Sequence, residues 1–231
     1  MLKYFINTVF LLSTIVLFSQ QNEVQQNDTI LKNNYGLRVG IDVFNPVNAF
    51  LNDDRKGLEL VGDYRISKKW YAAAELGFLE ETTNEDFINF TTNGSYIKAG
   101  VDYNAYENWL DMENAIYVGF RYGYSTFSQT LNSFTINNDA FFDDLATPEI
   151  GQKLDNLNAH WAEIVLGIKV ETLNNLYLGF SFSGKKMITT KEPDGFKNLF
   201  VPGFNRVFLN NSGFGFNYTI SYLIPLYKRD K

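Results

Sequence analysis

Most of the chain repeats a period-two pattern, in which a large apolar side chain alternates with a polar, charged or glycine residue. In the segment 115–127, Ile116, Val118 and Phe120 fall on one face, whereas Gly119 and Arg121 fall on the other. Successive side chains of a β-strand point to opposite faces of a sheet, so the pattern predicts strands with one apolar and one polar face. Eight segments of about ten residues show it, and that is the length a tilted strand needs to cross a bilayer. They cover residues 35–44, 57–66, 70–79, 95–103, 115–127, 160–171, 176–186 and 213–224.

The connections between these segments alternate in length. The second and third segments are joined by a few residues around Ser67, the sixth and seventh by residues 172–175, and the fourth and fifth by an intermediate connection, 104–114. The other connections are longer and rich in Asn, Asp, Thr and Gly, and one of them extends from Ser128 to Ala159. Short turns at one end and long loops at the other are typical of bacterial outer-membrane barrels. The sequence therefore predicts an all-β chain, an eight-stranded antiparallel up-and-down transmembrane β-barrel with short periplasmic turns and long extracellular loops.

The glycines indicate which face of the barrel is inside. Most of the glycines in these segments, such as Gly119 and Gly123, lie on the polar face, whereas Gly62 lies on the apolar face. The lumen of an eight-stranded barrel is just wide enough to be filled by side chains, so its inner face needs small residues beside large ones. The apolar face is therefore predicted to contact lipid.

The N-terminal residues have the pattern of a secretory signal peptide. Lys3 precedes an apolar run from Tyr4 to Phe18, and small or polar residues follow. We expect a signal peptide at residues 1–19, a flexible periplasmic segment at 20–34, the barrel at 35–227 and a short periplasmic tail at 228–231. The predicted location is the outer membrane of a Gram-negative bacterium.

Composition excludes several classes of function. The 231 residues include no cysteine, which excludes disulfides, thiolate metal sites and a cysteine nucleophile. The net charge of -6 argues against a nucleic-acid partner. We expect no cofactor, and we expect outer-membrane lipid, lipopolysaccharide and, during insertion, the barrel-assembly machinery as partners.

The polar face carries charged side chains of both signs, which the barrel would enclose. A charge buried in so narrow a lumen is tolerable only when it is paired and hydrogen-bonded. The sequence favours a salt-bridged plug over an ion or proton relay, because no ring of single-sign charge is present. The predicted lumen network consists of Arg38, Asp42, Glu59, Asp63, Arg65, Glu75, Lys98, Asp102, Arg121, Glu163, Lys169 and Glu171.

Aromatic residues near the segment ends are expected to lie at the two membrane interfaces. Those near the turn side are Tyr35, Tyr64, Trp70 and Tyr103, and those near the loop side are Phe44, Phe78, Tyr122 and Tyr124.

The longest predicted loop offers further candidates. Thr147 before Pro148 is suited to begin a short amphipathic helix, which Phe141 and Phe142 would anchor at the membrane surface. The Asn and Asp residues of this loop and of the first loop lack the spacing of a calcium-binding loop, so we expect no metal site. Those residues are Asn52, Asp53, Asp54, Asp139, Asp143 and Asp144.

His160 is the single histidine and the only weak catalytic candidate. Some eight-stranded barrels modify lipid A with a histidine at this level, and Glu163 follows three residues later. In a strand, however, residues 160 and 163 point to opposite faces. No serine is placed beside them by the sequence, so an enzyme is the less favoured hypothesis. A soluble periplasmic lipocalin-like barrel, with the apolar face inward around a lipid, is a second alternative.

Two segments of the sequence are similar to segments of a known group of proteins. They are the strand-like residues 35–42, YGLRVGID, and the closing residues 213–222, GFGFNYTISY, and the signal ending at residues 17–21, LFSQQ, accompanies them. The chain resembles the small outer-membrane β-barrel proteins of the Bacteroidota, several families of which have no assigned function. The resemblance implies the fold and the location of the protein. It assigns no catalytic residue to this sequence. The expected role is structural, or binding through the surface loops, at the cell envelope.

Overall fold

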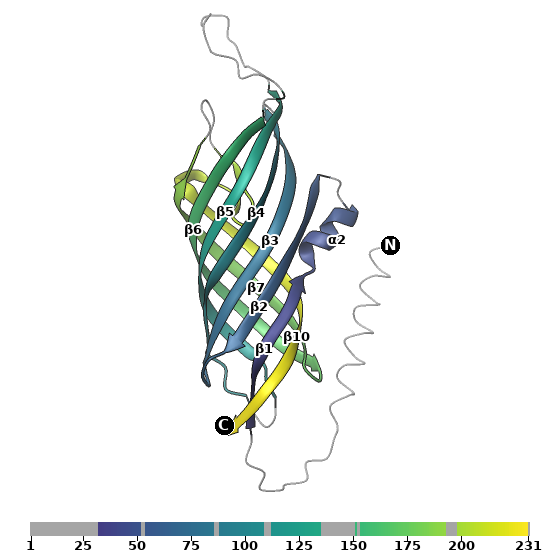
Figure 1. Cartoon of the computed structure of the whole chain (residues 1–231), viewed down its shortest axis with the longest axis vertical. Coiled ribbons are helices and arrows are strands. Elements are labelled where there is room, and N and C mark those ends of the chain that lie inside the picture. Colours follow the sequence, from purple (N-terminus) through teal and green to yellow (C-terminus); the bar gives the residue numbers. More distant parts are fainter. Residues whose placement is uncertain are drawn as a thin grey trace, which may run out of the picture. The chain divides into compact units, whose positions relative to one another are not determined.

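The computed structural model describes residues 32–51, 54–85, 88–108, 112–134, 151, 153–192 and 198–230, and within this part eight strands form a closed antiparallel barrel (Figure 1). Each strand pairs with its neighbour in the chain, and the last strand, β10, closes the ring on β1. The predicted eight-stranded up-and-down barrel is therefore confirmed. The strands are β1 (Lys32–Asp42), β2 (Arg55–Arg65), β3 (Trp70–Glu85), β4 (Ile88–Asn104), β5 (Ala115–Phe134), β6 (Lys153–Leu173), β7 (Leu176–Thr190) and β10 (Ser212–Asp230).

Apolar side chains point outward all around the barrel. Leu37 on β1, Leu166 on β6 and Phe216 on β10 are all exposed, whereas Arg38 and Arg121 are buried inside. Apolar residues on the outside and charged residues within are the reverse of a soluble barrel. This arrangement contradicts the lipocalin-like alternative, which requires an apolar lumen.

Glycines on the inner face make room for aromatic rings from the neighbouring strand. Gly123 lies directly opposite Trp161, and Gly167 lies opposite Tyr117. A Cβ atom on either glycine would overlap the opposing ring. Large and small residues are thus paired across the strands, which is how a narrow lumen fills without voids.

The barrel has a turn end and a loop end. At the turn end, where β1 begins and β10 finishes, the connections are short. Asn175, in the turn between β6 and β7, adopts a φ of 65°, which asparagine tolerates better than most residues. Lys69 and Glu107 lie 2.8 Å apart beside the turn between β2 and β3. The hydrogen bond and charge of Lys69 lower the pKa of Glu107, but the pair is exposed and contributes little stability.

At the loop end several strands continue well beyond the predicted ten residues. The connection from 80 to 94, which the sequence predicts as a loop, is instead a hairpin of β3 and β4 with Glu85 opposite Ile88. Thr82 and Thr91 hydrogen-bond to each other across it at 3.0 Å. Threonine is β-branched and favours strands, so the polar residues here extend the sheet rather than end it.

β5 and β6 likewise extend into the predicted loop 128–159. β5 continues to Phe134 and β6 begins at Lys153. Phe141, Phe142 and the predicted helix at Thr147 lie outside the described residues. So do the predicted signal peptide and residues 20–31 of the predicted flexible segment.

Two predictions near the turn end are wrong. Tyr35 was expected at the membrane interface, but it is 3% exposed and stacks on Tyr227 at a centroid distance of 5.2 Å. The register shifts between Tyr35 and Gly36, where the partner strand contains Pro225, and this bulge breaks the alternation that the prediction assumed. The predicted tail also belongs to the barrel, because Lys228 and Arg229 pair with β1.

A short hairpin folds into the loop end of the barrel. It consists of β8 (Phe200–Val201) and β9 (Asn205–Arg206), and the 3-10 helix η1 (Leu209–Asn211) follows it. Phe204 N–H donates to Val201 C=O at 3.0 Å across Pro202 and Gly203, and Gly203 has a φ of 81°. Proline followed by a glycine at positive φ is the sequence of a type II turn.

The hydrophobic core of the barrel lies beneath this hairpin. Phe204 is fully buried and packs edge-on against Trp161, with ring centroids 5.9 Å apart. The hairpin is also tied to the wall by Gln129, whose Nε2 donates to Phe200 C=O at 3.2 Å. The core cluster consists of Leu79, Phe90, Tyr96, Phe127, Leu157, Ala159, Trp161, Met187, Phe200, Val201 and Phe204.

One short helix, α2 (Phe44–Leu51), follows β1 and lies beside β2 (Figure 1). Phe44, which the sequence places at a strand end, is therefore a helical residue, and it contacts Phe216 on β10 with ring centroids 5.4 Å apart. Among the described residues, no helix is long and apolar enough to cross a membrane.

Candidate functional site

A continuous chain of ion pairs occupies the middle of the lumen. Its members alternate in sign, and every consecutive pair lies within 4.0 Å. Asp63, for example, lies 2.6 Å from Lys169, and Asp102 lies 2.7 Å from Arg121. In order, the chain consists of Arg38, Asp63, Lys169, Asp102, Arg121, Glu75, Lys98 and Glu59. Cations and carboxylates are equal in number, so the network is formally neutral.

An aromatic side chain contacts the charged group at each end of this ion-pair chain. The Arg38 guanidinium lies 4.2 Å from the centroid of the Tyr177 ring. At the opposite end, the Tyr96 hydroxyl donates to Glu59 at 2.5 Å. Cation–π contacts and charge-assisted hydrogen bonds both stabilise ions that have left water.

The remaining predicted lumen residues lie in three separate places. Arg65 pairs with Glu113 at 2.8 Å at the turn end. Glu171, near the same end, accepts a hydrogen bond from the Asn175 N–H at 2.8 Å. Asp42 lines a cavity at the loop end, and Glu163 lies 3.6 Å from Lys185, which lines the same cavity.

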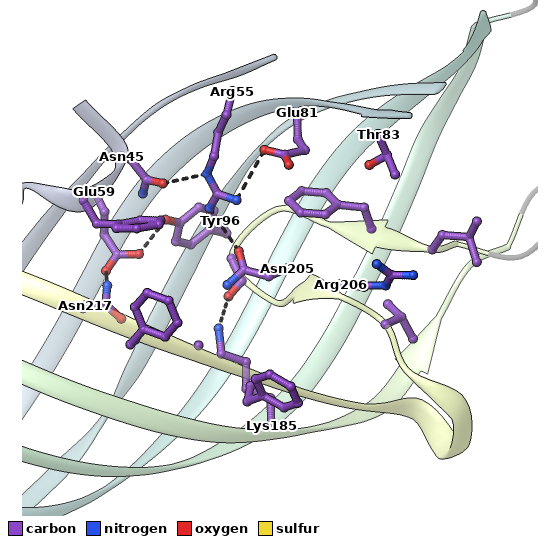
Figure 2. Close-up of a pocket in the computed structure, with 18 of the residues that line it drawn as sticks. Asn45, Arg55, Glu59, Glu81, Thr83, Tyr96, Lys185, Asn205, Arg206 and Asn217 are labelled. Carbon is purple, nitrogen blue, oxygen red and sulfur yellow. Dashed lines mark hydrogen bonds and ion pairs between the residues drawn. The ribbon is translucent and has the colours of Figure 1, made fainter. Parts of the chain in front are cut away.

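The mouth cavity has a volume of about 600 Å³ and is lined by β2, β3, β4, β7, β10, helix α2 and the β8–β9 hairpin (Figure 2). Arg55 links three of these elements. Its Nε donates to Asn45 Oδ1 on α2 at 3.0 Å, and its guanidinium lies 3.3 Å from Glu81 on β3. A longer contact of 3.4 Å reaches Asn205 on β9. The Arg55 side chain thus connects β2 with α2, β3 and β9 in the cavity wall.

The floor of the cavity is polar. Asn217 Nδ2 donates to Asp42 at 3.0 Å and to Glu59 at 2.7 Å, so it bridges two buried carboxylates. Lys185 Nζ donates to the Gly203 C=O at 2.7 Å and lies 3.6 Å from Glu163. The mouth cavity therefore combines buried groups of both charges with apolar walls.

The sequence did not single out several of these residues. Glu113 and Asn205 lie in predicted loops, where no periodicity assigns a side chain to the lumen. Lys185 lies in a predicted strand, two residues after Ser183 and four after Ser181. The period-two alternation therefore places its side chain on the lumen face with theirs. Asn217 lies on the same face of its predicted strand as Gly215, so the alternation places this uncharged side chain inside as well.

His160 lies on the outer surface of the barrel. Its Nδ1 is 2.9 Å from the Tyr122 hydroxyl, and its ring centroid is 4.6 Å from that of Tyr124. Glu163 faces the lumen, where it accepts a hydrogen bond from Trp161 Nε1 at 2.5 Å. The strand separates the two candidate catalytic groups, so they cannot act on one substrate.

The other predicted interface aromatics lie on the outer surface. Trp70 and Tyr103 are in contact near the turn end, with ring centroids 5.1 Å apart. Phe78 and Tyr122 are exposed, but they lie near the middle of β3 and β5, because these strands continue beyond the predicted ends. Tyr64 and Tyr124 are partly exposed on the same surface.

The described part of the chain contains no group of three His, Asp or Glu side chains placed to hold a metal ion. Of the six Asn and Asp loop residues named above, all but Asp54 lie outside that part.

Among solved structures, the chain is similar to Ail, the attachment invasion locus protein of Yersinia pestis. The two are 10% identical, the alignment covers 84% of this chain and 99% of Ail, and the TM-score is 0.42. No curated protein matches the sequence. A family model described as a domain of unknown function (DUF6048) matches residues 1–229.

Proposed function

The chain belongs to the DUF6048 family of domains of unknown function, and from this premise we propose that it is an outer-membrane β-barrel that binds a ligand in its mouth cavity and conducts no solute. The observation that carries this proposal is the orientation of the side chains, with apolar residues exposed outside and paired charges buried inside.

The outer surface supports the membrane location. A wide belt of exposed Leu, Ile, Val and Phe side chains would be unfavourable in water, whereas lipid tails contact it without cost. Trp70 and Tyr103 near the turn end have the amphipathic rings that interfaces favour. Lipopolysaccharide is then the natural lipid neighbour at the loop end, and the barrel-assembly machinery the route of insertion. The resemblance of the strand sequences supports a Bacteroidota source.

The lumen supports a closed barrel. Each carboxylate of the ion-pair chain already contacts at least one cation, so a permeating ion would have to displace a paired charge. The β8–β9 hairpin covers the same lumen from the loop end, with Phe204 fully buried. Diffusion pores instead line a water-filled channel with unpaired polar groups.

The mouth cavity supports binding rather than catalysis. A volume of about 600 Å³ lies within the range of small-molecule sites, and apolar walls with a few convergent polar groups are typical of them. The enzyme alternative depended on His160, which lies on the outer surface and is separated from Glu163 by the strand.

Membrane fractionation of cells that express the full-length protein tests the proposal. We expect recovery in the outer membrane and, in detergent gels, different mobilities for boiled and unboiled samples, because a closed barrel resists unfolding by cold detergent. Gly119→Leu is a useful variant, since its side chain would overlap Asp102 and hinder closure. A freely soluble periplasmic protein without a heat-dependent shift would contradict the proposal.

A further inference from the structure

The barrel wall lacks one strand at its loop end, because β1 ends at Asp42 while both of its neighbours continue, and this gap in the sheet is called the opening below. The pairing of β1 with β10 ends at Asp42 and Thr219, and its pairing with β2 ends at Asp42 and Glu59. β10 nevertheless begins at Ser212 and β2 at Arg55, so both strands extend beyond the end of β1. Within the described residues, no strand lies between these two extensions, and the first turn of helix α2 contacts both of them through Asn45 and Phe44.

The free edge of β10 presents backbone groups to this opening. Tyr218 N–H donates to Asp42 Oδ1 at 3.2 Å, and Tyr218 C=O accepts from Val43 N–H at 2.8 Å, so both groups of Tyr218 point toward β1. In an antiparallel strand, residues two apart present their backbone groups to the same side. The backbone groups of Phe216 and Phe214 therefore point into the opening.

The opening lies at the upper limit of the apolar outer belt. On β10 the outward residues remain apolar up to Phe214, and on β2 they remain apolar up to Leu58, after which Lys56 is exposed. Under the proposed orientation this level is the outer leaflet of the membrane. A side entrance here connects lipid, rather than bulk water, with the lumen.

The mouth cavity reaches this entrance. Phe44, Phe214 and Phe216, which lie beside the opening, line the same cavity as Asp42 and Lys185 on its floor. Phe208 stacks on Phe214 with ring centroids 4.9 Å apart and extends the apolar wall. One continuous site therefore begins with aromatic rings at the barrel surface and ends with buried charges.

Helix α2 borders the entrance and is itself suited to a lipid interface. Val47 and Phe50, three residues apart on one face of the helix, are exposed, Phe50 to 91%. An exposed apolar face on a short helix beside an apolar belt favours insertion among the headgroups and upper acyl chains.

We propose that the mouth cavity binds an acyl-chain amphiphile with a zwitterionic headgroup, which enters from the outer leaflet through the opening between β10 and β2. The acyl chain lies along Phe44, Phe214 and Phe216, and the headgroup lies over the cavity floor. The inference rests on the proposed membrane location and names the ligand class for the mouth cavity.

The charges of the cavity select the headgroup. Acidic and basic side chains line it in equal numbers, namely Asp42, Glu59, Glu81, Glu85, Arg55, Lys98, Lys185 and Arg206. An anionic or a cationic headgroup would leave an unbalanced charge at low dielectric, whereas a zwitterion leaves none. Asp42 accepts hydrogen bonds from Asn217 and two backbone amides but joins none of the described ion pairs, so it is suited to an ammonium group. Lys185 and Arg55 are suited to a phosphate.

Binding of defined lysolipids to the purified full-length barrel in maltoside micelles tests the proposal by native mass spectrometry. The probes are lysophosphatidylethanolamine, lysophosphatidylglycerol with the same acyl chain, and glycerophosphoethanolamine, which has the headgroup without a chain. We expect one bound lysophosphatidylethanolamine, affinity about tenfold lower for the glycerol lipid, and no binding of the chain-free headgroup. Equal binding of the two lysolipids, or binding of the chain-free headgroup, would overturn it.

A matched pair of variants locates the entrance. Phe216→Ala alters the opening, whereas Phe182→Ala removes the residue directly opposite on β7, which is 46% exposed like Phe216 but faces a continuous wall. Only the first is expected to weaken lysophosphatidylethanolamine binding, by about tenfold. Equal effects of the two variants refute the entrance.

The gel shift of the same samples separates the two proposals. A barrel that shows the shift and resides in the outer membrane, yet fails the lipid test, refutes the amphiphile and leaves the membrane proposal standing. Absence of the shift in the wild-type protein refutes the proposed function itself.

Discussion

At the scale of single residues, the orientation of each side chain decides what a substitution costs. Leu166 is 54% exposed on the outer face, where its neighbours across the strands are Val118 and Phe182. Leu166→Arg is expected to lower the free energy of unfolding by about 2–4 kcal/mol if the residue lies near the bilayer midplane. Denaturant unfolding from phospholipid vesicles measures the change. Asn174→Arg, in the turn between β6 and β7, is the control and should have little effect.

Tolerance of Leu166→Arg alone would place residue 166 near an interface. Tolerance of both Leu166→Arg and Gly119→Leu would contradict the assignment of the two faces, because the second variant forces a large side chain against Asp102 in the lumen.

Lys98 is the residue on which the lumen network depends most. It lies 2.5 Å from Glu75 and 3.1 Å from Glu59, and all three are buried or nearly so. Lys98→Met leaves the buried Glu59 carboxylate without its cation, while Glu75 keeps its ion pair with Arg121, and should cost about 3–5 kcal/mol of unfolding free energy. The double variant Lys98→Met with Glu59→Gln should recover part of the loss. The exposed Lys68→Met, in a turn, serves as control, and an equal cost for both lysines would refute the network's importance.

At the scale of elements, period-two alternation predicted every barrel strand and its inward face. It could not predict where strands end. Thr82 and Thr91 are polar and lie in a stretch without alternation, which is typical of loops, and only their pairing across β3 and β4 shows that they belong to strands. The bulge beside Tyr35 depends on how β10 meets β1, a contact between distant parts of the chain. The partners within the lumen network likewise depend on strand register, which alternation alone leaves undetermined.

The β8–β9 hairpin had a sequence signal that the prediction did not use. Pro202-Gly203 between apolar residues marks a tight turn flanked by short strands. Phe204 then enters the core, so Phe204→Ala should cost about 3–5 kcal/mol of unfolding free energy. Leu209→Ala, at a residue that is 92% exposed, is the control for equilibrium unfolding. A similar small effect for both would show that the hairpin is detached from the core.

At the scale of the whole molecule, the lumen is closed twice, by the ion-pair chain and by the hairpin above it. The purified protein in a planar lipid bilayer should therefore produce no stepwise current at moderate voltage. A general porin, recorded in the same bilayer apparatus, is the positive control and does produce such steps. Reproducible single-channel steps would refute a plugged barrel. The prediction holds at any salt concentration, because the ion pairs are shielded from bulk water.

The seam between β1 and β10 also governs the order in which this barrel assembles. Lys32 pairs with Asp230 and Asp42 with Thr219, so the ring closes only when the two ends of the described chain meet. Contacts between residues so distant in sequence form slowly, because the intervening chain loses much conformational freedom before they form. Until β10 is in place, β1 and β7 both present unpaired edges that other chains can bind. A chain truncated before Ser212 should therefore yield an open, aggregation-prone sheet rather than a smaller barrel.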